Sequence, residues 1–280
     1  MNEPASFNGP LPENLEFHDE EQISDHRRMH NVYGHNMAKA AYEGLKAETG
    51  RRPYVITRAC YAGTQKYSTV WTGDNQSLWS HLQLSIPQLT NLGLSGFAFA
   101  GTDIGGFQAD ATGELLIRWL ESALFVPLFR NHAALGTRYQ EPWAFDKQTL
   151  NIYRKYLNLR YRLIPFLYDQ FRHETQAGLP VMRPLVLNYD HDHRLAVSTM
   201  NIWLAPVFWL HRSLRHRRQN AWSTCQRVNG LIFGIMHLMP AGRLSLSMHQ
   251  SINCHCLSKP IRSCHGDAKP CMSAINLIRL

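Results

Sequence analysis

Apolar residues between positions 36 and 176 follow two alternating spacings, one typical of amphipathic helices and one typical of short buried strands. Spacings of three and four residues predict helices over 35–48, 75–91, 112–125 and 147–177. Short apolar runs predict strands over 53–57, 68–72, 95–101 and 126–129. Strands and helices therefore alternate along this part of the chain.

Capping residues are expected to set the ends of these helices. Gly50 is expected to close the first helix and Gly93 the second, because glycine tolerates the left-handed conformation found there. Asp146 is a suitable N-cap for the long fourth helix, which Pro165 is expected to kink and Gly178 to end.

Apolar strands alternating with amphipathic helices indicate an α/β fold built on a parallel sheet. Polar residues follow the strands, namely Arg58, Asp74, Asp103 and the run Arg130–Asn131–His132. In a (β/α)8 barrel the ligand and catalytic groups occupy this position, so we favour a barrel over a doubly wound sheet. The glycine-rich run 101–106 has neither the dinucleotide nor the P-loop spacing. Four strands amount to half a barrel with two open edges.

Two of these carboxylates stand among aromatic and glycine residues. Asp74 lies in Trp71-Thr-Gly-Asp-Asn, and Asp103 lies in Gly101-Thr-Asp-Ile-Gly-Gly-Phe107. A carboxyl group beside apolar rings has a raised pKa, which suits a general acid near neutral pH. Taken alone, an aspartate in such a position is more often a turn or helix-capping residue than a catalytic one.

The neighbouring residues are open to two interpretations as well. Trp71 and Phe107 suit a platform for a sugar ring, although aromatic residues at strand ends often belong to the core. Arg58 and His132 suit recognition of hydroxyl groups, although a single Arg or His is commonly a structural hydrogen-bonding group.

The same residues and their neighbours form a series of motifs. In order these are Met1-Asn-Glu-Pro, Thr57-Arg-Ala, Trp71-Thr-Gly-Asp-Asn-Gln, Gly101-Thr-Asp-Ile-Gly-Gly-Phe and Phe129-Arg-Asn-His. Their order and spacing closely resemble the α-glucosidases of glycoside hydrolase family 31. The run Leu179-Pro-Val-Met-Arg-Pro-Leu also resembles the segment that leaves that family's barrel for its C-terminal β-domains. The resemblance covers residues 1 to about 190.

The resemblance implies a retaining mechanism, in which one carboxyl group is the nucleophile and a second is the proton donor. It implies that the strands are the fifth to eighth of a (β/α)8 barrel and that Asp74 is the general acid/base. The residues expected around the terminal α-linked glucose of an oligosaccharide are Arg58, Trp71, Asp103, Phe107 and His132. The reaction requires no cofactor and no metal, and we expect neither.

The sequence departs from the family at its N-terminus. The family nucleophile is the Asp directly before Met-Asn-Glu-Pro, and this chain begins at Met1. Glu3 is not expected to replace it, because the motif places Glu3 beyond the strand end. We therefore expect residues 1–280 alone to show no measurable α-glucosidase activity. The alternative function is a non-catalytic carbohydrate-binding protein or a degenerate pseudoenzyme.

Charge and cysteine content change abruptly near residue 190. The net charge is +8, yet residues 1–188 contain 18 Lys+Arg and 18 Asp+Glu. Residues 189–280 contain 11 and 3, together with five of the six cysteines and eight of the fifteen histidines. The whole basic excess therefore lies in the last third of the chain.

A shifted reading frame explains this tail. Read one base out of frame, the codons of 222–230 can encode Val-Tyr-Leu-Pro-Glu-Gly-Glu-Trp, which resembles a strand of the family's C-terminal β-domain. We hypothesise a frameshift near residue 193, and the alternative is a genuine divergent tail. The expected parts are a partial barrel over 1–178, an exit segment over 179–192 and a poorly ordered tail over 193–280.

The tail contains apparent metal and nucleic-acid signals. Cys254-His-Cys256, Cys264 and Cys271 do not have the spacing of a standard zinc site. The basic run Arg212–Arg218 is typical of a nucleic-acid patch. Out-of-frame translation would scatter such residues, so we expect no specific nucleic-acid partner. A basic nucleic-acid-binding protein is a third, weaker interpretation.

No membrane or secretory signal is found. Apolar stretches such as Trp203–Leu210 are eight residues long, short of the roughly 18 that a membrane span needs. The N-terminus has no basic and apolar regions of a signal peptide. Cys60 is the single cysteine of residues 1–188, which fits a reducing compartment. We expect a cytoplasmic protein.

Overall fold

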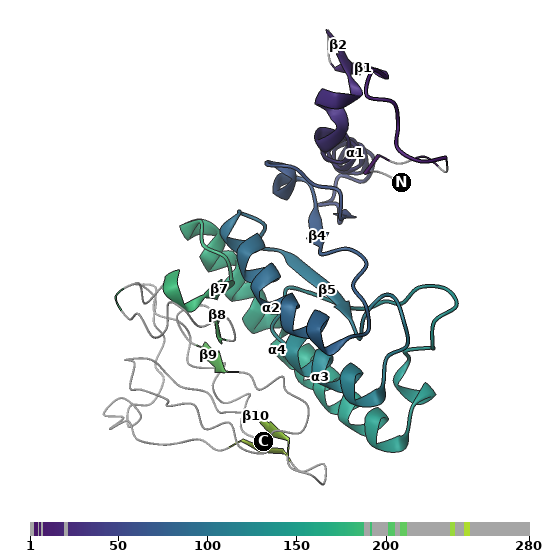
Figure 1. Ribbon diagram of the computed structural model, residues 1–280. Helices are drawn as coiled ribbons and strands as arrows, with labels where there is room; N and C mark the ends of the chain where they lie inside the picture. The colour runs from purple at the N-terminus through teal and green to yellow at the C-terminus, as the bar shows by residue number, and fades with distance from the viewer. Residues whose placement is uncertain are drawn as a thin grey trace, which may run out of the picture.

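The computed structural model describes residues 3–4, 6, 8–19, 22–187 and 191, and the backbone of four short strands between 201 and 246. Its N-terminal part is an antiparallel hairpin of β1 (Glu16–Asp19) and β2 (Gln22–Asp25), followed by helix α1 (His26–Thr49). Figure 1 shows the hairpin and α1 at one end of the molecule, beyond the other helices.

The central element is a parallel sheet with strand order β3-β4-β5-β6. Its strands are β3 (Ile56–Thr57), β4 (Thr69–Trp71), β5 (Ala100–Ile104) and β6 (Leu128–Asn131). Helix α2 (Trp79–Leu94) connects β4 to β5, and α3 (Gly113–Ala123) connects β5 to β6. The predicted α/β fold with a parallel sheet is confirmed. We call the C-terminal ends of these four strands, with the loops that follow them, the carboxyl edge.

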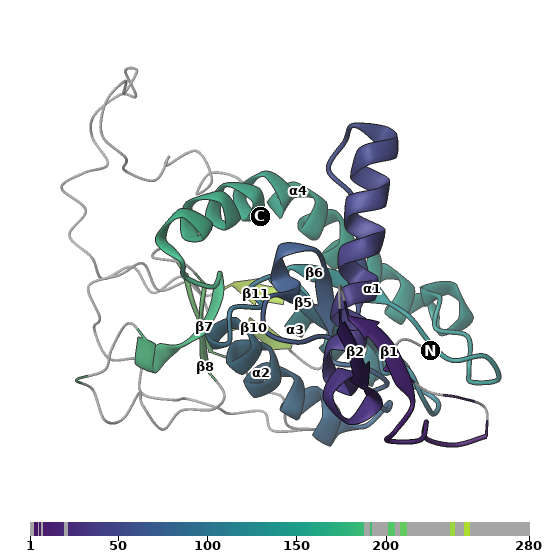
Figure 2. The same ribbon diagram turned by 90° about the horizontal axis from the view of Figure 1, so that it is seen from above.

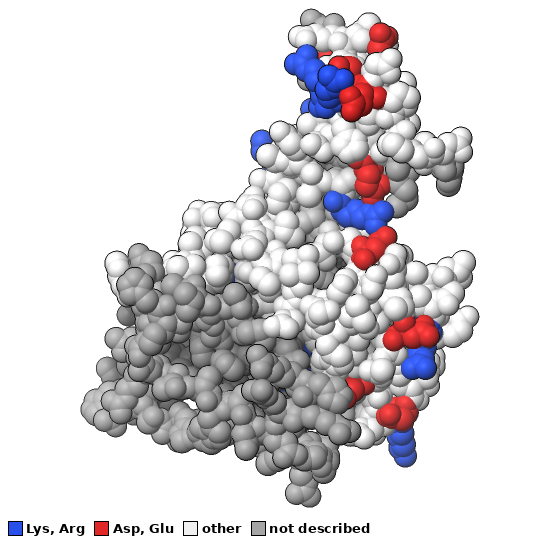
Figure 3. All heavy atoms as spheres, in the orientation of Figure 1, with Lys and Arg blue, Asp and Glu red and all other residues white. Residues whose placement is uncertain are grey.

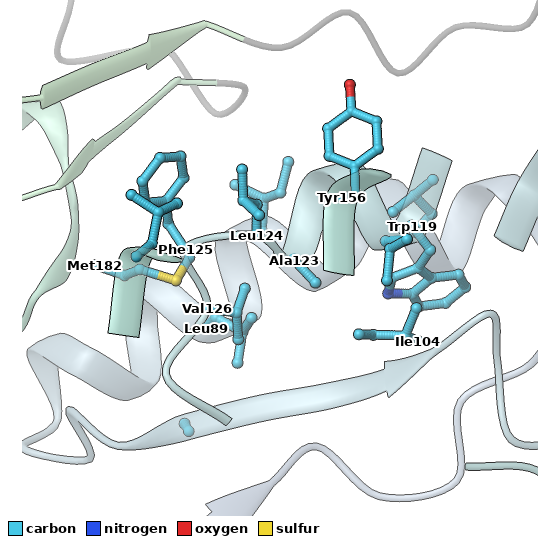
Figure 4. Packing of buried hydrophobic residues seen from close by; sticks show 14 of the residues in the cluster. Leu89, Ile104, Trp119, Ala123, Leu124, Phe125, Val126, Tyr156 and Met182 are labelled. Carbon is cyan, nitrogen blue, oxygen red and sulfur yellow. The ribbon is translucent and has the colours of Figure 1, made fainter. Parts of the chain in front are cut away.

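Three helices form the core together with the sheet. Helices α2 and α3 contact β5, and α4 (Lys147–Ala177) packs on α3, as Figures 1 and 2 show from two sides. Figure 4 shows how side chains of these helices meet over β5, with Ile104 beside Trp119 and Leu89 beside Val126. The indole Nε1 of Trp119 donates to Thr102 Oγ1 at 3.1 Å, so this buried ring is also tied to the strand beneath it.

Helix α4 is additionally joined to the segment that leads into β6. The buried guanidinium of Arg160 donates to the backbone carbonyl oxygens of Leu124 at 2.6 Å and Pro127 at 3.0 Å. It lies over the ring of Phe129, 5.0 Å from the ring centroid. This contact holds the start of β6 and thereby helps to place the residues at its far end.

The predicted capping residues of two helices are confirmed. The amide of Thr149 donates to Asp146 Oδ1 at 2.6 Å, and α4 ends before Gly178, whose φ is +70°. Gly50 has a φ of +63° and closes α1. Pro165 lies inside α4, and the kink expected there stays a prediction.

The predicted start of α1 is wrong by nine residues. The helix begins at His26 because Asp25 caps it, accepting a hydrogen bond from the Arg28 amide at 3.0 Å. The buried side of its first turns includes His26 and Met29. A histidine on the buried face interrupts the apolar spacing, so the pattern became visible only further along the chain.

The predicted function of Gly93 is also wrong. Helix α2 runs to Leu94, and Gly93 lies in its last turn with a negative φ. A Cβ at Gly93 would come within 2.9 Å of the Met182 carbonyl oxygen in β7 (Met182–Pro184). Glycine is therefore needed here for the close approach of a strand rather than for a helix cap.

Strands β5 and β6 lie further along the chain than predicted. Ser95 and Gly96 form the turn that ends α2, so β5 starts at Ala100 rather than at Ser95. Strand β6 similarly starts at Leu128. The consequence is that Asp103 and Arg130 are strand residues facing each other in register, and do not follow the strands as predicted.

Short strands also lie in the C-terminal third. Strand β7 pairs with β8 (Asn201–Leu204), which pairs with β9 (Phe208–His211), and β10 (Met236–Leu238) pairs with β11 (Leu244–Leu246). Short 3-10 turns are found at Thr64–Lys66, Pro142–Ala144 and Leu185–Leu187. The cysteines of the tail and the run Arg212–Arg218 lie outside the described residues, and the division into three parts stays a prediction.

Candidate active site

Arg58, which follows β3, joins two carboxylates at the carboxyl edge. Its Nη1 is 2.6 Å from Asp74 Oδ1, and its Nε donates to Glu3 Oε1. The hydrogen bonds that Arg58 donates to Asp74 and to Glu3 raise the pKa of Arg58. Burial alone would raise the pKa of Glu3, but the hydrogen bond from Arg58 lowers it. Asp74 is therefore held against a permanently charged group that it shares with Glu3.

The chain turns sharply to bring Asp74 to this position. Gly73, two residues after the end of β4, has a φ of +85°. A side chain at this φ would be strained, so glycine allows the loop to turn directly after the strand. The carboxylate of Asp74 then projects at the edge and is partly exposed.

Asp103 and Arg130 form a second ion pair between neighbouring strands. Both Nε and Nη2 of Arg130 donate to Asp103 Oδ1, at 2.9 Å and 2.5 Å. Asp103 is fully buried, and burial raises its pKa although Arg130 acts in the opposite direction. The Arg130 guanidinium also lies 5.0 Å from the centroid of the Trp71 ring. One arginine therefore orients both a carboxylate and an aromatic ring.

Phe107 and His132 form the third contact of the site. Their rings are stacked, with centroids 5.1 Å apart and an interplanar angle of 29°. The Ala134 amide donates to the Phe107 carbonyl oxygen at 2.8 Å, which ties the loop after β6 to the loop after β5. His132 and Asp74 both act electrostatically on Asp103, so the three contacts lie close together.

Several buried polar atoms at this edge have no hydrogen-bond partner among the described residues. They are Glu3 Oε2, Trp71 Nε1, Thr72 Oγ1, Asp103 Oδ2 and Gln140 Oε1. Leaving a buried donor or acceptor unpaired costs about 1–3 kcal/mol. A group of them at one place is the arrangement expected where a ligand with several hydroxyl groups supplies the missing hydrogen bonds.

All six residues predicted from the sequence lie at the carboxyl edge. The structure pairs Arg58 with Asp74, stacks Phe107 on His132, and joins Trp71 to Asp103 through Arg130. The roles given to them by resemblance stay predictions.

Four residues at this edge were given no role from the sequence. Glu3 binds Arg58, Arg130 binds Asp103, and Gln140 donates to the Gly106 carbonyl oxygen at 2.6 Å. Asn75 binds both Asp103 and Phe107. Glu3, Asn75 and Arg130 stand inside the motifs quoted above, and that position was the available signal.

Charges of both signs are interspersed on the surface. Figure 3 shows acidic and basic side chains in adjacent groups on the face that it presents. Within the described part of the chain, no three His, Cys, Asp or Glu residues are grouped so that they could hold a metal ion. In the same part of the chain, no helix has the length and apolar character needed to span a membrane.

A parallel α/β sheet whose carboxyl edge gathers carboxylates, guanidinium groups and aromatic rings is the arrangement of barrel-type α/β enzymes. The profile of the "Glycosyl hydrolases family 31 TIM-barrel domain" matches residues 1–170. The chain belongs to family 31 of the glycosyl hydrolases, as the sequence motifs predicted.

Relatives agree with this assignment. Alpha-glucosidase 2 of Bacillus thermoamyloliquefaciens is 49% identical over 206 residues, which cover 72% of this chain and 26% of that protein. Neutral alpha-glucosidase AB of Homo sapiens is 43% identical over 204 residues, covering 72% and 21%. The chain thus spans about a quarter of the length of these relatives.

The chain is similar to two solved structures of glycosidases. The Tris-bound glucosidase II alpha subunit superposes with a TM-score of 0.73 and 33% identity, covering 78% of this chain and 24% of that one. The family 31 dextranase of Flavobacterium johnsoniae in complex with glucose superposes with a TM-score of 0.66 and 32% identity, covering 70% and 26%.

Proposed function

We propose that this chain supplies the proton donor and most of the sugar-binding groups of a retaining α-glucosidase, which removes terminal non-reducing α-linked glucose from oligosaccharides. In this proposal β3 to β6 are the fifth to eighth strands of a (β/α)8 barrel. Asp74 is the general acid/base, and Arg58, Trp71, Asp103, Phe107 and His132 surround the glucosyl unit.

The observation that carries the proposal is the position of Asp74. Its carboxylate is partly exposed, it is bound to Arg58 at 2.6 Å, and it lies at the same edge as a set of unpaired buried polar atoms. Those atoms offer both acceptors, as in Asp103 Oδ2, and a donor, in Trp71 Nε1. A sugar ring, whose hydroxyl groups donate and accept, satisfies both kinds.

The proposed reaction has two steps. Asp74 first gives its proton to the glycosidic oxygen while the nucleophilic carboxylate attacks the anomeric carbon, and the aglycone leaves with that proton. Asp74, now a carboxylate, then takes a proton from water as the water attacks the glycosyl-enzyme. By the resemblance, the nucleophile is the residue that precedes the Met-Asn-Glu-Pro motif.

Arg58 has a direct consequence for these steps. A carboxylate that accepts from a guanidinium group is the basic form, which the second step requires. Protonation of Asp74 for the first step must weaken its contact with Arg58, and Glu3 then keeps Arg58 in place. Glu3 therefore preserves the geometry while Asp74 changes its charge.

The relatives support the type of substrate. Two of them are probable glucan 1,3-alpha-glucosidases of rice and Arabidopsis thaliana, and the glucosidase II alpha subunit has been solved with Glc1Man2 and with alpha3-Glc2. These names agree in glucose and differ in the rest of the substrate.

Ligand binding tests the site separately from turnover. The glucose analogue deoxynojirimycin should bind the purified chain in calorimetry, and Asp74→Asn should weaken that binding at least about 10-fold, because a charge-assisted contact is lost. Asp169→Asn is the matched control, since Asp169 is exposed on α4, away from the carboxyl edge. Equal binding by both variants, or no binding by the parent, would contradict the proposed site.

Turnover tests the chemistry. In a form of the protein that carries the partner carboxylate, Asp74→Asn should lower kcat/KM for 4-nitrophenyl α-glucoside by about 100-fold or more, which is the usual contribution of a general acid. Binding of the sugar by both forms without any turnover would instead favour the carbohydrate-binding alternative.

A further inference from the structure

The side chain of Asn75 forms hydrogen bonds from the loop after β4 to both ends of the turn after β5. The Nδ2 of Asn75 donates to the Asp103 carbonyl oxygen at 3.0 Å, and its Oδ1 accepts from the Phe107 amide at 2.9 Å. We propose that Asn75 is a positioning residue that locks the backbone carrying Asp74 to the turn carrying Phe107, and thereby sets where the Asp74 carboxylate meets Arg58.

The chemistry of this contact requires a carboxamide. One end of the Asn75 side chain donates to a carbonyl oxygen and the other accepts from an amide, so both of its functions are used. An aspartate of the same shape has no donor and would set a carboxylate oxygen against the Asp103 carbonyl oxygen. A serine is too short to reach both partners.

Backbone contacts extend the connection on either side of Asn75. The amides of Phe107 and Gln108 both donate to the Asn75 carbonyl oxygen at 2.9 Å, and the Ser77 amide donates to the Gln108 carbonyl oxygen at 2.8 Å. The Ser77 hydroxyl also donates to the Ala109 carbonyl oxygen at 3.2 Å. The two loops therefore form one hydrogen-bonded unit.

The loops also approach too closely for a side chain between them. Gly106 has a φ of +97°, and a Cβ there would lie 2.4 Å from the Ser77 amide nitrogen. Any side chain at position 106 would therefore collide with the loop after β4. The Asn75 side chain sets how the two surfaces are aligned.

Asp74 is consequently fixed from both sides. Gly73 turns the chain before it, and Asn75 anchors the chain after it. Phe107, at the other end of the connection, is stacked on His132, so the same unit reaches the loop after β6. Asn75 thus holds the acid/base and the ring expected beside the sugar in one fixed relation.

Two NMR measurements on the purified chain test this inference. The first is the hydrogen exchange rate of the Phe107 and Gln108 amides, which Asn75→Asp should increase about 10-fold or more, since the hydrogen bond to the Asp103 carbonyl oxygen is lost, a carboxylate oxygen is set against that oxygen and the loops separate. The second is the rate of rotation about the Arg58 Nε–Cζ bond, which should rise toward the rate measured in Asp74→Asn. Asn158→Asp makes the same chemical change on an exposed turn of α4 and should alter neither rate.

Each outcome decides the inference. Unchanged exchange at Phe107 would show that Asn75 does not hold the two loops. Faster exchange with unchanged Arg58 rotation would show that Asn75 supports the turn without positioning Asp74, which also overturns the proposal. If Asn75→Asp does not fold, Asn75→Ser is measured in its place.

The inference that Asn75 positions a catalytic residue rests on the proposed function, but neither NMR rate depends on turnover. A chain that shows both changes and does not bind deoxynojirimycin would keep the inference about Asn75 and reject the proposed function.

Discussion

Two arginines of this protein lie over aromatic rings at the same distance, but they differ in their location and in their hydrogen-bond partners. Arg160, in the helix layer, is 5.0 Å from the Phe129 centroid and donates to two backbone carbonyl oxygens. Arg130, at the carboxyl edge, is 5.0 Å from the Trp71 centroid and donates twice to one oxygen of Asp103. Arg160 therefore binds backbone carbonyl oxygens, which every residue has, whereas Arg130 binds one specific buried carboxylate.

The difference separates a structural site from a functional one. Burial lowers the pKa of Arg160 to about 10, and its partners are neutral, so it joins α4 to the segment before β6 without balancing a charge. Arg130 compensates the buried charge of Asp103 but leaves Asp103 Oδ2 unpaired. A buried polar atom without a hydrogen-bond partner lowers the stability of a folded protein. Such an atom is expected at a functional site, where a ligand supplies the missing hydrogen bond.

The largest expected change in the free energy of unfolding follows from breaking the ion pair between Asp103 and Arg130. Arg130→Met should lower the free energy of unfolding by about 3 kcal/mol, the lower end for a broken buried pair because Arg130 is itself 27% exposed. Urea unfolding measures the change. The double variant Arg130→Met/Asp103→Asn should recover much of the loss, and a double variant as unstable as the single one would mean that the buried charge is not the cause.

A smaller effect is expected in the helix layer. Arg160→Met should cost about 1–2 kcal/mol, because two carbonyl oxygens lose their donor while the cost of burying a charge disappears as well. Arg154→Met, on an exposed position of the same helix, is the control for loss of an arginine from α4. A loss equal to that of Arg130→Met would remove the distinction between the two arginines.

The contribution of the carboxyl edge to folding stability should depend on pH, whereas that of the helix layer should not. Because burial raises the folded-state pKa of Asp103 above the ordinary value of about 3.9, the folded protein binds this proton more tightly than the unfolded chain. The stability that Asp103 contributes is therefore fully present below about pH 4 and is lost as the pH rises through the raised pKa. The urea midpoint of the parent should fall relative to that of Asp103→Asn across this window, and parallel curves would contradict the assignment.

The smallest effect is expected for an ion pair far from both regions. Arg27 and Glu13 are 2.8 Å apart, but their side chains are 72% and 73% exposed. Glu13→Gln should change the free energy of unfolding by less than about 1 kcal/mol, because water screens such pairs. A larger change by urea unfolding would show that distance alone, without burial, decides the value of these contacts.

Much of the candidate site was predictable because its residues stand in short motifs. Asp74 and Asp103 stand among glycine and aromatic residues, His132 stands in a polar run after a predicted strand, and the structure places all three at one edge of one sheet. The positions of Asp103 and Arg130 within the strands were not predictable in the same way, since the start of β5 depends on the turn that ends α2.

Partners distant in the sequence could not be predicted. Glu3 lies 55 residues from Arg58, and Gln140 lies 34 residues from Gly106. No spacing rule connects such residues, because their meeting depends on strand order and loop packing. Gly93 illustrates the same limit. Its local pattern indicated a helix cap, but glycine is needed there because β7 approaches too closely for a side chain.

The sequence by itself determined the features that depend on neighbours a few residues away. These are the alternation of strands and helices, the ends of α4 at Asp146 and Gly178, and the turn at Gly50, all of which follow from local backbone preferences and capping. Only the tertiary structure decided that Arg58 holds two carboxylates, that Arg130 joins Asp103 to Trp71, and that Asn75 joins two loops. Each of these contacts exists because parallel strands bring their carboxyl ends to one edge. A buried polar group at this edge lowers stability unless it finds a hydrogen-bond partner.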